Sequence, residues 1–292
     1  MAASSSKKKL VVCGGTGFLG SRICRAAVSR NWTVVSLSRS GAPNWSAITS
    51  SSTPPAWSTS VAWEKADILK PSTYQTHLEN ADAVVHSMGI LLEADYKGVL
   101  QGRESLFSGL ARAFSATKGG SQNPLERSPG EELRPQESDG QLTYELMNRD
   151  SAIALAQEAA AKGVDTFVFI SAAGGAPILP TRYITTKREA ESTIASKFPK
   201  MRSIFMRPGF LYDSSRWFTV PLAYGTLPLA GLNWASGKRL SLLLGAAVEK
   251  PLKADTVAKA VVEAVDDAST KGPVITEDIE ELANKAWRKD ML

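Results

Sequence analysis

Residues 13–20 read Cys-Gly-Gly-Thr-Gly-Phe-Leu-Gly, and this stretch decides the fold. The short apolar run 10–13 before it has the composition of a β-strand, and residues 18–30 after it carry apolar side chains at helical spacing. A strand, a glycine-rich turn and a helix in direct succession form the first half of a βαβ unit. The opening of the chain therefore predicts a parallel sheet with helices packed on its faces.

The glycines of this stretch stand three residues apart, at Gly14, Gly17 and Gly20. The first lets the chain turn sharply off the strand, the second lets a pyrophosphate approach the backbone, and the third lets the helix pack closely. The helix N-terminus adds unpaired N–H groups and a partial positive charge. We therefore predict a dinucleotide-binding loop. Its cofactor-binding residues are Gly14, Thr16, Gly17, Phe18, Leu19 and Gly20.

Outward from this loop, strand-like and helix-like segments alternate along the chain. Strands are predicted at 32–38, 61–66, 81–86, 166–171 and 202–207, and helices at 144–162, 183–197, 255–268 and 277–289. The segment from Ser40 to Ser60 is rich in Ser, Thr and Pro and is predicted to be a long surface loop. The predicted fold class is α/β, a doubly wound parallel Rossmann sheet with right-handed crossovers and a small C-terminal substrate lobe.

The domain organisation that follows has a flexible N-terminus at 1–9 and a Rossmann domain at 10–212. Residues 213–292 form the substrate lobe and the returning helices, packed on the same domain. An insertion at about 93–141 falls on the edge where such sheets bind ligands, either as a surface loop or as a lid. The apolar stretch 218–248 is either a substrate wall or ordinary core.

Composition excludes several classes of protein. A formal net charge of +5 without a basic stripe excludes nucleic-acid binding as the main function, but leaves room for anionic ligands or a peripheral membrane contact. Two cysteines and two histidines are too few for a metal site, so the cysteines are predicted to be buried free thiols. We expect no secretory signal and no transmembrane helix, and residues 1–9 contain no recognisable transit peptide.

The second strand indicates which dinucleotide binds. NAD-binding proteins usually place a carboxylate after this strand to accept from the ribose hydroxyls. Here no Asp or Glu occurs between Val11 and Trp63, and the strand ends in Ser38-Arg39-Ser40. A guanidinium flanked by hydroxyls pairs well with a 2′-phosphate. The cofactor is therefore predicted to be NADP(H); the alternative is that Arg39 is an exposed loop charge.

Two further loops follow strands that end at the same edge of the sheet. Asp67 and Ile68 follow the third strand, where the carboxylate can hold the adenine amino group and the isoleucine can cover the ring. Ser87, Met88 and Gly89 follow the fourth strand and are predicted to border the cofactor.

The candidate catalytic residues are Tyr183, Lys187, Ser171 and Asn148. Tyr183 and Lys187 are four residues apart and share one face of a predicted helix, where a nearby ammonium favours the phenolate. Such a tyrosine can exchange a proton while the cofactor exchanges hydride. Ser171 ends a buried strand and can hold a substrate oxygen, while Asn148 can support a water or the lysine. The alternative is a surface Tyr and Lys on an amphipathic helix.

Together these motifs resemble the extended and atypical short-chain dehydrogenases/reductases. The resemblance rests on GGTGFLG (14–20), DIL (67–69), VVHSMG (84–89), Ser171, YITTK (183–187) and RPG (207–209), and it covers roughly residues 9–212. It implies that Tyr183, Lys187 and Pro208 also border the cofactor. The Ala-Ala-Gly-Gly that follows Ser171 departs from sugar-nucleotide epimerases, which argues against a nucleotide-sugar substrate.

A closer resemblance is to a fungal mitochondrial branch of that family, which belongs to the coenzyme Q biosynthetic complex and is similar to the NADPH-binding accessory subunit of respiratory complex I. It rests on GGTGFLGSRIC, SLSRSG, HSMGILLE, YELMN, YITTKREAE and MRPGFLYD. The branch implies a location on the matrix side of the inner mitochondrial membrane, other coenzyme Q biosynthesis proteins as partners, and an apolar quinone-type ligand.

Three functions are compatible with these observations. The first is an NADP(H)-dependent oxidoreductase acting on a carbonyl or hydroxyl of a quinone precursor in ubiquinone synthesis. The second is a non-catalytic subunit whose bound NADPH stabilises the fold and the complex. The third is an epimerase or dehydratase acting on a nucleotide sugar, against which Arg39 argues because such enzymes usually retain NAD.

Overall fold

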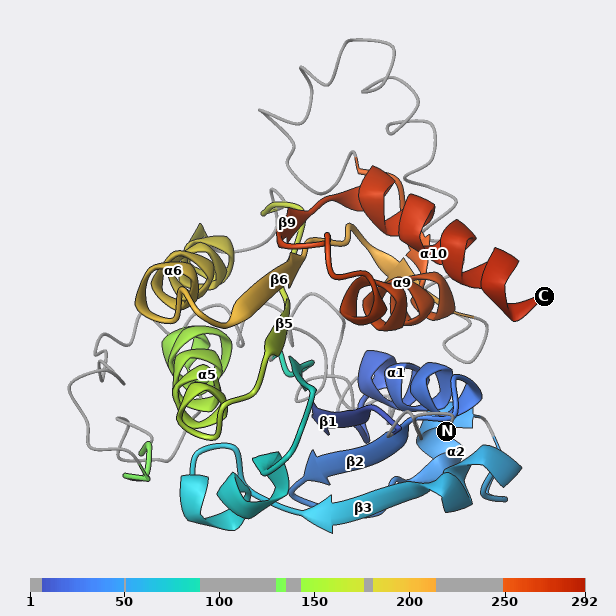
Figure 1. The fold of residues 1–292 in the computed structure, drawn as a ribbon, viewed down its shortest axis with the longest axis horizontal. Coiled ribbons are helices and arrows are strands. Elements are labelled where there is room, and N and C mark those ends of the chain that lie inside the picture. Colours follow the sequence, from blue (N-terminus) through green and yellow to red (C-terminus); the bar gives the residue numbers. More distant parts are fainter. Residues whose placement is uncertain are drawn as a thin grey trace, which may run out of the picture.

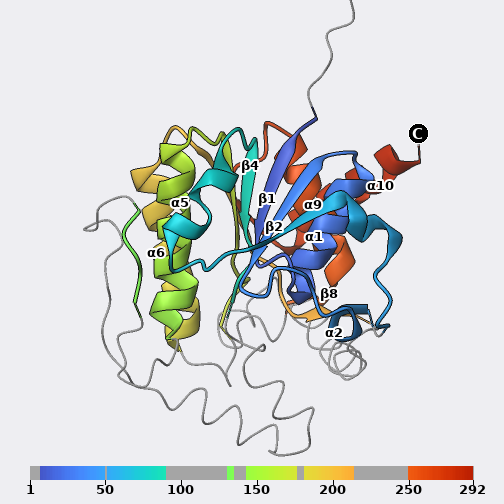
Figure 2. The same ribbon diagram turned by 90° about the horizontal axis from the view of Figure 1, so that it is seen from below.

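The computed structural model describes residues 7–49, 51–89, 130–134, 143–175, 181–213 and 249–291. Within these ranges the chain forms a layered α/β fold, with a sheet between two groups of helices (Figures 1 and 2). The predicted segment 218–248 and most of the predicted insertion 93–141 lie outside the described residues.

The central sheet has seven strands, all parallel, in the order β3-β2-β1-β4-β5-β6-β9. The strands are β1 (Lys9–Cys13), β2 (Thr33–Ser38), β3 (Val61–Lys65), β4 (Ala83–His86), β5 (Thr166–Ile170), β6 (Arg202–Met206) and β9 (Gly272–Val274). The order reverses between β1 and β4, which creates the switch point where such sheets bind ligands. The predicted doubly wound parallel sheet is confirmed.

Helices cover both faces of the sheet, as Figures 1 and 2 show. On one face α1 (Phe18–Ser29) packs against α9 (Ala254–Asp266), and α9 packs against α10 (Thr276–Asp290). On the other face lie α5 (Ser151–Ala161) and α6 (Thr181–Lys197). The predicted helices at 255–268 and 277–289 are therefore α9 and α10, with ends that differ by one or two residues.

The core has two halves because strand side chains alternate between the faces of the sheet. Along β1, Val11 and Cys13 belong to the half beneath α5, whereas Leu10 and Val12 belong to the half beneath α1 and α9. Both faces are buried, so the strand is one continuous apolar run rather than an alternating one. Both free cysteines, Cys13 and Cys24, are buried, as predicted, and burial raises the pKa of each thiol above its ordinary value.

The prediction of one long surface loop from Ser40 to Ser60 is wrong. The segment contains a short helix, α2 (Trp45–Thr49), and a 3-10 turn, η1 (Ala56–Ser60). The cause is an aromatic cluster, since the Trp45 ring meets the rings of Trp57 and Trp63 edge-to-face with centroids 5.6 Å apart. Such contacts are worth more than their buried area alone, and they order a stretch whose other residues favour loops.

Several short elements were not predicted. These are strand β9, two 3-10 turns η2 (Pro71–Thr73) and η3 (Gln75–Leu78), and a second, two-stranded sheet of β7 (Leu211–Tyr212) and β8 (Leu252–Lys253). None has more than four residues, so none is long enough to show a hydrophobic period. The predicted helix at 144–162 begins as a π-helical turn, η5 (Glu145–Asp150), and continues as α5.

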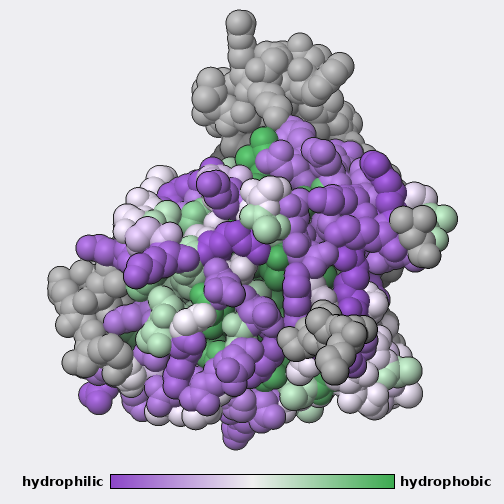
Figure 3. Space-filling view, in the orientation of Figure 1, coloured by the Kyte–Doolittle hydropathy of each residue, from purple (hydrophilic) through white to green (hydrophobic). Residues whose placement is uncertain are grey.

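The surface seen in Figure 3 is mostly hydrophilic, with hydrophobic colour confined to small recessed areas between elements. Among the described helices, none is both long and apolar enough to cross a bilayer. The described residues also contain no group of three His, Cys, Asp or Glu side chains placed to hold a metal ion.

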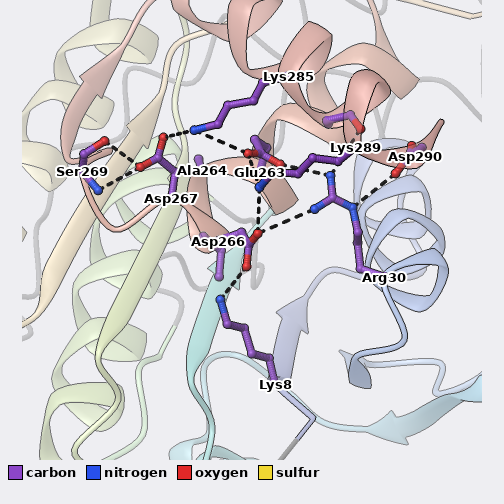
Figure 4. Close-up of polar contacts among 12 residues, drawn as sticks. Lys8, Arg30, Glu263, Ala264, Asp266, Asp267, Ser269, Lys285, Lys289 and Asp290 are labelled. Atoms are coloured by element: carbon purple, nitrogen blue, oxygen red, sulfur yellow. Dashed lines mark hydrogen bonds and ion pairs between the residues drawn. The ribbon is translucent and has the colours of Figure 1, made fainter. Parts of the chain in front are cut away.

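A buried carboxylate ties α9 to α1 and α10 (Figure 4). The side chain of Glu263 is 0% exposed, with Oε2 3.0 Å from a guanidinium nitrogen of Arg30 and Oε1 2.7 Å from Nζ of Lys289. Lys285 lies 3.7 Å from the same Oε1. Three cations therefore neutralise one buried anion, as burial of a charge requires.

We expect Glu263→Gln to destabilise the fold, because it leaves three cations around a buried neutral amide. Loss of one partner from a buried ion pair costs about 3–5 kcal/mol, so we expect a fall of about 3 kcal/mol in the free energy of unfolding in urea. The control is Asp290→Asn, which removes a partly exposed partner of Arg30 and is expected to cost less than about 1 kcal/mol. Equal losses of unfolding free energy in the two variants would show that the buried Glu263 carboxylate contributes no more to stability than an exposed one.

Candidate functional site

The glycine loop lies between the carboxyl ends of β1 and β4, at the switch point of the sheet. Gly14 has φ +87°, a conformation that favours glycine, and its N–H donates to the carbonyl oxygen of Leu37 at the end of β2. The N–H of Gly17 then donates to the Gly14 carbonyl at 2.9 Å, which closes the turn. These contacts hold the loop in the tight turn that the sequence predicts.

Two further glycines allow the helix and the second strand to approach the loop. A side-chain carbon on Gly20 would overlap the carbonyl oxygen of Gly14, so α1 can lie here only without one. A side-chain carbon on Gly15 would overlap the hydroxyl of Ser36 on β2 in the same way. The three-residue spacing of glycines predicted the need for Gly20 but did not predict the need for Gly15. The adjacent Gly-Gly pair was the available signal for it.

Helix α1 presents its N-terminus to the loop. Its N-cap is Gly17, and no side chain in the described ranges caps the first turn. The side chain of Leu19 is buried in the core, and the ring of Phe18 stacks on the Arg22 guanidinium at 4.5 Å. Both predicted side chains are thus engaged within the protein, so any contact of these residues with an anion would fall to the helix backbone.

A hollow opens beside the loop. It is lined by Cys13, Gly14, Thr16, Gly17, Leu37, Ser38, Arg39, Ser40, Ala66, Ile68, Tyr74, Ser87 and Met88. Nine of these were predicted to bind cofactor, and they come from the ends of four strands. Backbone amides, hydroxyls, one guanidinium and apolar walls suit a phosphate-bearing nucleotide with an aromatic base, so the residues present fit a dinucleotide.

The end of β2 forms one rim of the hollow. Arg39 is exposed, and no ion pair to it is found in the part of the chain that the structure describes. The hydroxyl of Ser38 donates to the Gly41 carbonyl at 3.0 Å and lies 3.4 Å from the hydroxyl of Ser40. An exposed cation beside two hydroxyls is therefore available to an anionic group at this rim.

Asp67 and Ile68 have different places. The Asp67 carboxylate accepts the N–H of Leu69 at 3.1 Å, and its own N–H donates to the hydroxyl of Thr73 at 3.0 Å. Asp67 thus stabilises its own turn and is absent from the lining of the hollow, whereas Ile68 contributes to it. Ser87 lines the hollow too, but its hydroxyl donates to the Cys13 carbonyl at 2.9 Å.

The Tyr-Lys pair lies further along the same edge, outside the lining of the hollow. Lys187 is buried, and its Nζ donates to the Ile170 carbonyl at 2.9 Å. The same Nζ lies 5.0 Å from the ring centre of Phe169 and 5.7 Å from that of Tyr183. The structure thus brings the two predicted residues together, while a second ring, Tyr144, meets Tyr183 edge-to-face with centroids 6.0 Å apart.

Burial shifts the pKa of both members of the pair. It lowers the pKa of Lys187 to about 7 and raises the pKa of Tyr183 to about 12. The positive charge of Arg188 opposes the rise at Tyr183. The expected preference for the phenolate is therefore not present in the protein alone, because burial outweighs the nearby charge.

Arg188, which the sequence analysis missed, braces the loop that carries Ser171. One guanidinium nitrogen donates to the Ser171 hydroxyl at 3.0 Å and to Glu191 at 2.7 Å, and the other donates to the carbonyls of Ala172 and Ala173. A guanidinium cannot accept, so Ser171 must use an oxygen lone pair here and keeps its own proton for another acceptor. Only the position of Arg188 directly after Lys187 hinted at this role.

The remaining predicted residues lie beneath and beside the pair. Asn148 is fully buried on the π-helical turn, and among the described residues neither its amide nitrogen nor its oxygen has a hydrogen-bond partner. Its oxygen lies near Gly89, which follows the end of β4. Pro208 accepts the N–H of Ala173 at 2.8 Å and so supports the Ser171 loop. Buried orphan amides and π-helical turns are both found preferentially at functional sites.

The histidine of β4 is a core residue. Ser151 donates to the Met147 carbonyl and therefore accepts from Nε2 of His86, 2.9 Å away. Burial lowers the pKa of His86 to about 3, so the ring stays neutral. It packs at 5.4 Å against Phe169, beneath Lys187.

We expect Lys187→Met to stabilise the protein in a pH-dependent way. Below pH 7 both folded and unfolded chains carry the ammonium, so the folded chain bears the full cost of burying it. Between pH 7 and 10.5 only the unfolded chain keeps the proton, and the cost shrinks. The gain in melting temperature should therefore be larger at pH 6 than at pH 10. Lys197→Met, on the exposed side of the same helix, is the control. A gain independent of pH would contradict a buried, shifted amine.

Among proteins of known sequence, relatives match this chain over more than nine-tenths of its length. MIOREX complex component 2 of Saccharomyces cerevisiae is 35% identical over 289 residues, which cover 93% of this chain and 98% of that protein. An uncharacterised chloroplastic protein of Arabidopsis thaliana is 28% identical over 295 residues, covering 98% of this chain and 80% of that protein. Residues 10–95 match the NAD dependent epimerase/dehydratase family.

Solved structures share the fold at low sequence identity. Vestitone reductase from alfalfa aligns over 92% of this chain and 76% of its own, with a TM-score of 0.52 and 14% identity. The UDP-Glc/GlcNAc 4-epimerase of Campylobacter jejuni aligns over 94% of this chain and 82% of its own, with a TM-score of 0.53 and 16% identity. At such identities the likeness concerns the fold alone.

Proposed function

Because the chain belongs to the NAD(P)-binding, epimerase/reductase-like family of yeast MIOREX complex component 2, we propose that it binds NADP(H) at the glycine loop. We propose further that it is a carbonyl/hydroxyl oxidoreductase acting on a quinone precursor in ubiquinone synthesis. The observation that carries the cofactor proposal is Arg39, which is exposed on the rim of the hollow between Ser38 and Ser40 and has no ion pair among the described residues.

The choice of NADP(H) over NAD(H) rests on charge. A ribose hydroxyl needs an acceptor, but no Asp or Glu occurs from Val11 to Trp63, and Asp67 is engaged in its own turn. A 2′-phosphate needs donors, and the guanidinium of Arg39 supplies several in a planar fork. The loop amides and the N-terminus of α1 would hold the pyrophosphate.

We expect Arg39→Ala to weaken NADPH binding by about 10- to 100-fold, the range for loss of a charge-assisted hydrogen bond, and to change NADH binding less than twofold. Fluorescence titration of the purified protein measures both. Arg25→Ala is the matched control, since Arg25 is an exposed arginine of α1 whose partner is Asp255. Equal losses for the two nucleotides would refute the assignment.

In the proposed reaction a nucleotide held by the glycine loop would supply or accept the hydride. Tyr183 gives or takes the proton on the substrate oxygen, and Lys187 beneath its ring tunes that transfer. Ser171, whose lone pair is occupied by Arg188, donates its proton to the same substrate oxygen. Asn148, whose buried amide has no partner in the described part of the chain, would support a water or Lys187.

The proposed substrate and location rest on the sequence. The motifs that resemble the coenzyme Q branch argue for an apolar, ring-type ligand, and the apolar stretch 218–248 would supply its wall. The yeast relative is a component of a multiprotein complex. We therefore propose that this chain works with other coenzyme Q biosynthesis proteins on the matrix side of the inner mitochondrial membrane, with peripheral membrane contact.

A second function is favoured by a specific observation. The Ser171 hydroxyl and the Lys187 amine are both engaged by the protein itself, and Tyr183 holds its proton tightly. Such a site suits a non-catalytic subunit in which bound NADPH stabilises the fold and its complex. In that case the protein would need its nucleotide pocket for its function, but not the hydroxyl of Tyr183.

Tyr183→Phe separates the two functions, because it keeps the ring packing against Tyr144 and Lys187 and removes only the proton. If the protein is an oxidoreductase, cells that carry this variant in place of the wild type should lose ubiquinone synthesis while the purified variant still binds NADPH. Thr185→Val, at an exposed hydroxyl on the same helix, is the control. Normal ubiquinone in the Tyr183→Phe cells would favour the non-catalytic subunit.

A further inference from the structure

Tyr74 is a residue of the hollow that the sequence analysis did not single out. It lies between the 3-10 turns η2 and η3, after β3, and its side chain is 0% exposed. Its ring packs in the same apolar cluster as Cys13, Leu37 and Ile68, and all four residues line the hollow. The apolar end of the hollow, beside the rim at Arg39, is therefore walled partly by a phenol.

The hydroxyl of Tyr74 has no hydrogen-bond partner within the part of the chain that the structure describes. Asp67 and Glu158, two carboxylates whose charge acts on the phenol, accept instead from the N–H of Leu69 and from the N–H of Gly130 at 2.8 Å. Burial and these carboxylates hold the pKa of Tyr74 above its ordinary value. The phenol thus keeps its proton and is a donor without an acceptor.

An unpaired buried hydroxyl destabilises a protein unless something satisfies it. Phenylalanine would fill the same space without that cost, so packing does not explain the hydroxyl. The side chains of Cys13, Leu37 and Ile68, which share its apolar cluster and line the hollow, suit the flat face of a base. A purine has ring nitrogens that accept hydrogen bonds in the plane of the ring, and the Tyr74 hydroxyl has no acceptor of its own among the described residues.

We propose that Tyr74 recognises the base of the bound nucleotide, donating its phenolic proton to an acceptor nitrogen of adenine. This inference rests on the proposed function, because it requires an adenine nucleotide in the hollow. Tyr74 would then recognise the base, while the loop amides and Arg39 bind the phosphates. It would make the contact with adenine that was predicted for Asp67, whose carboxylate is engaged in its own turn.

The test is Tyr74→Phe, examined for both stability and binding. Without ligand the variant should melt about 2 °C or more above the wild type, because it loses an unsatisfied buried group. Its affinity for adenosine 2′,5′-bisphosphate, which is the adenine half of the cofactor, should fall about tenfold. Its affinity for nicotinamide mononucleotide should stay within twofold of the wild type. A merely structural tyrosine would not raise stability and lower affinity together.

Thr276→Val is the matched control. Its hydroxyl is also buried and unpaired, but it lies after β9, at the opposite edge of the sheet, so this variant should gain stability without losing affinity. Three results would overturn the proposal. Unchanged affinity for the adenine half in Tyr74→Phe would do so while leaving the proposed function intact, as would equal losses for both half-cofactors. Failure of the wild type to bind NADPH or adenosine 2′,5′-bisphosphate would overturn the proposed function as well.

Discussion

The contact between Gly20 and the carbonyl of Gly14 is the constraint on which the rest of the structure depends. Any side chain at Gly20 would overlap that oxygen, so α1 can start directly beside the end of β1 only with glycine there. This approach sets the helix on the sheet, leaves its first N–H groups uncapped, and brings the ends of β2 and β4 around the same hollow. The same steric condition therefore determines how α1 packs on the sheet and where the hollow opens.

The sheet and most helices were predictable because each is marked in the sequence by a long apolar pattern or by a short local motif. Strands such as β1 and β5 are continuous apolar runs, and α1 shows an apolar face over three turns. The glycine spacing, the lack of an acidic residue near Arg39 and the Tyr183–Lys187 spacing are all readable along the chain. The prediction that failed was the surface loop from Ser40 to Ser60, where contacts among tryptophan rings order a stretch of loop-like composition.

The less predictable part of the site consists of residues that act across elements. Arg188 reaches from α6 to the loop after β5. Tyr74 lines the hollow from the junction of η2 and η3, two 3-10 turns that are too short to show a hydrophobic period. The buried state of Lys187 depends on Phe169 and Ile170, which lie on another element. Such roles depend on contacts between segments far apart in the chain, and a single sequence carries no signal for them.

The account's central claim is that the hollow at the glycine loop holds NADP(H), and titration of the purified wild-type protein with NADPH and NADH, followed by fluorescence, tests it most directly. We predict saturable binding of NADPH with clearly weaker binding of NADH. Binding of neither nucleotide would contradict the claim and leave the glycine loop as a structural turn only.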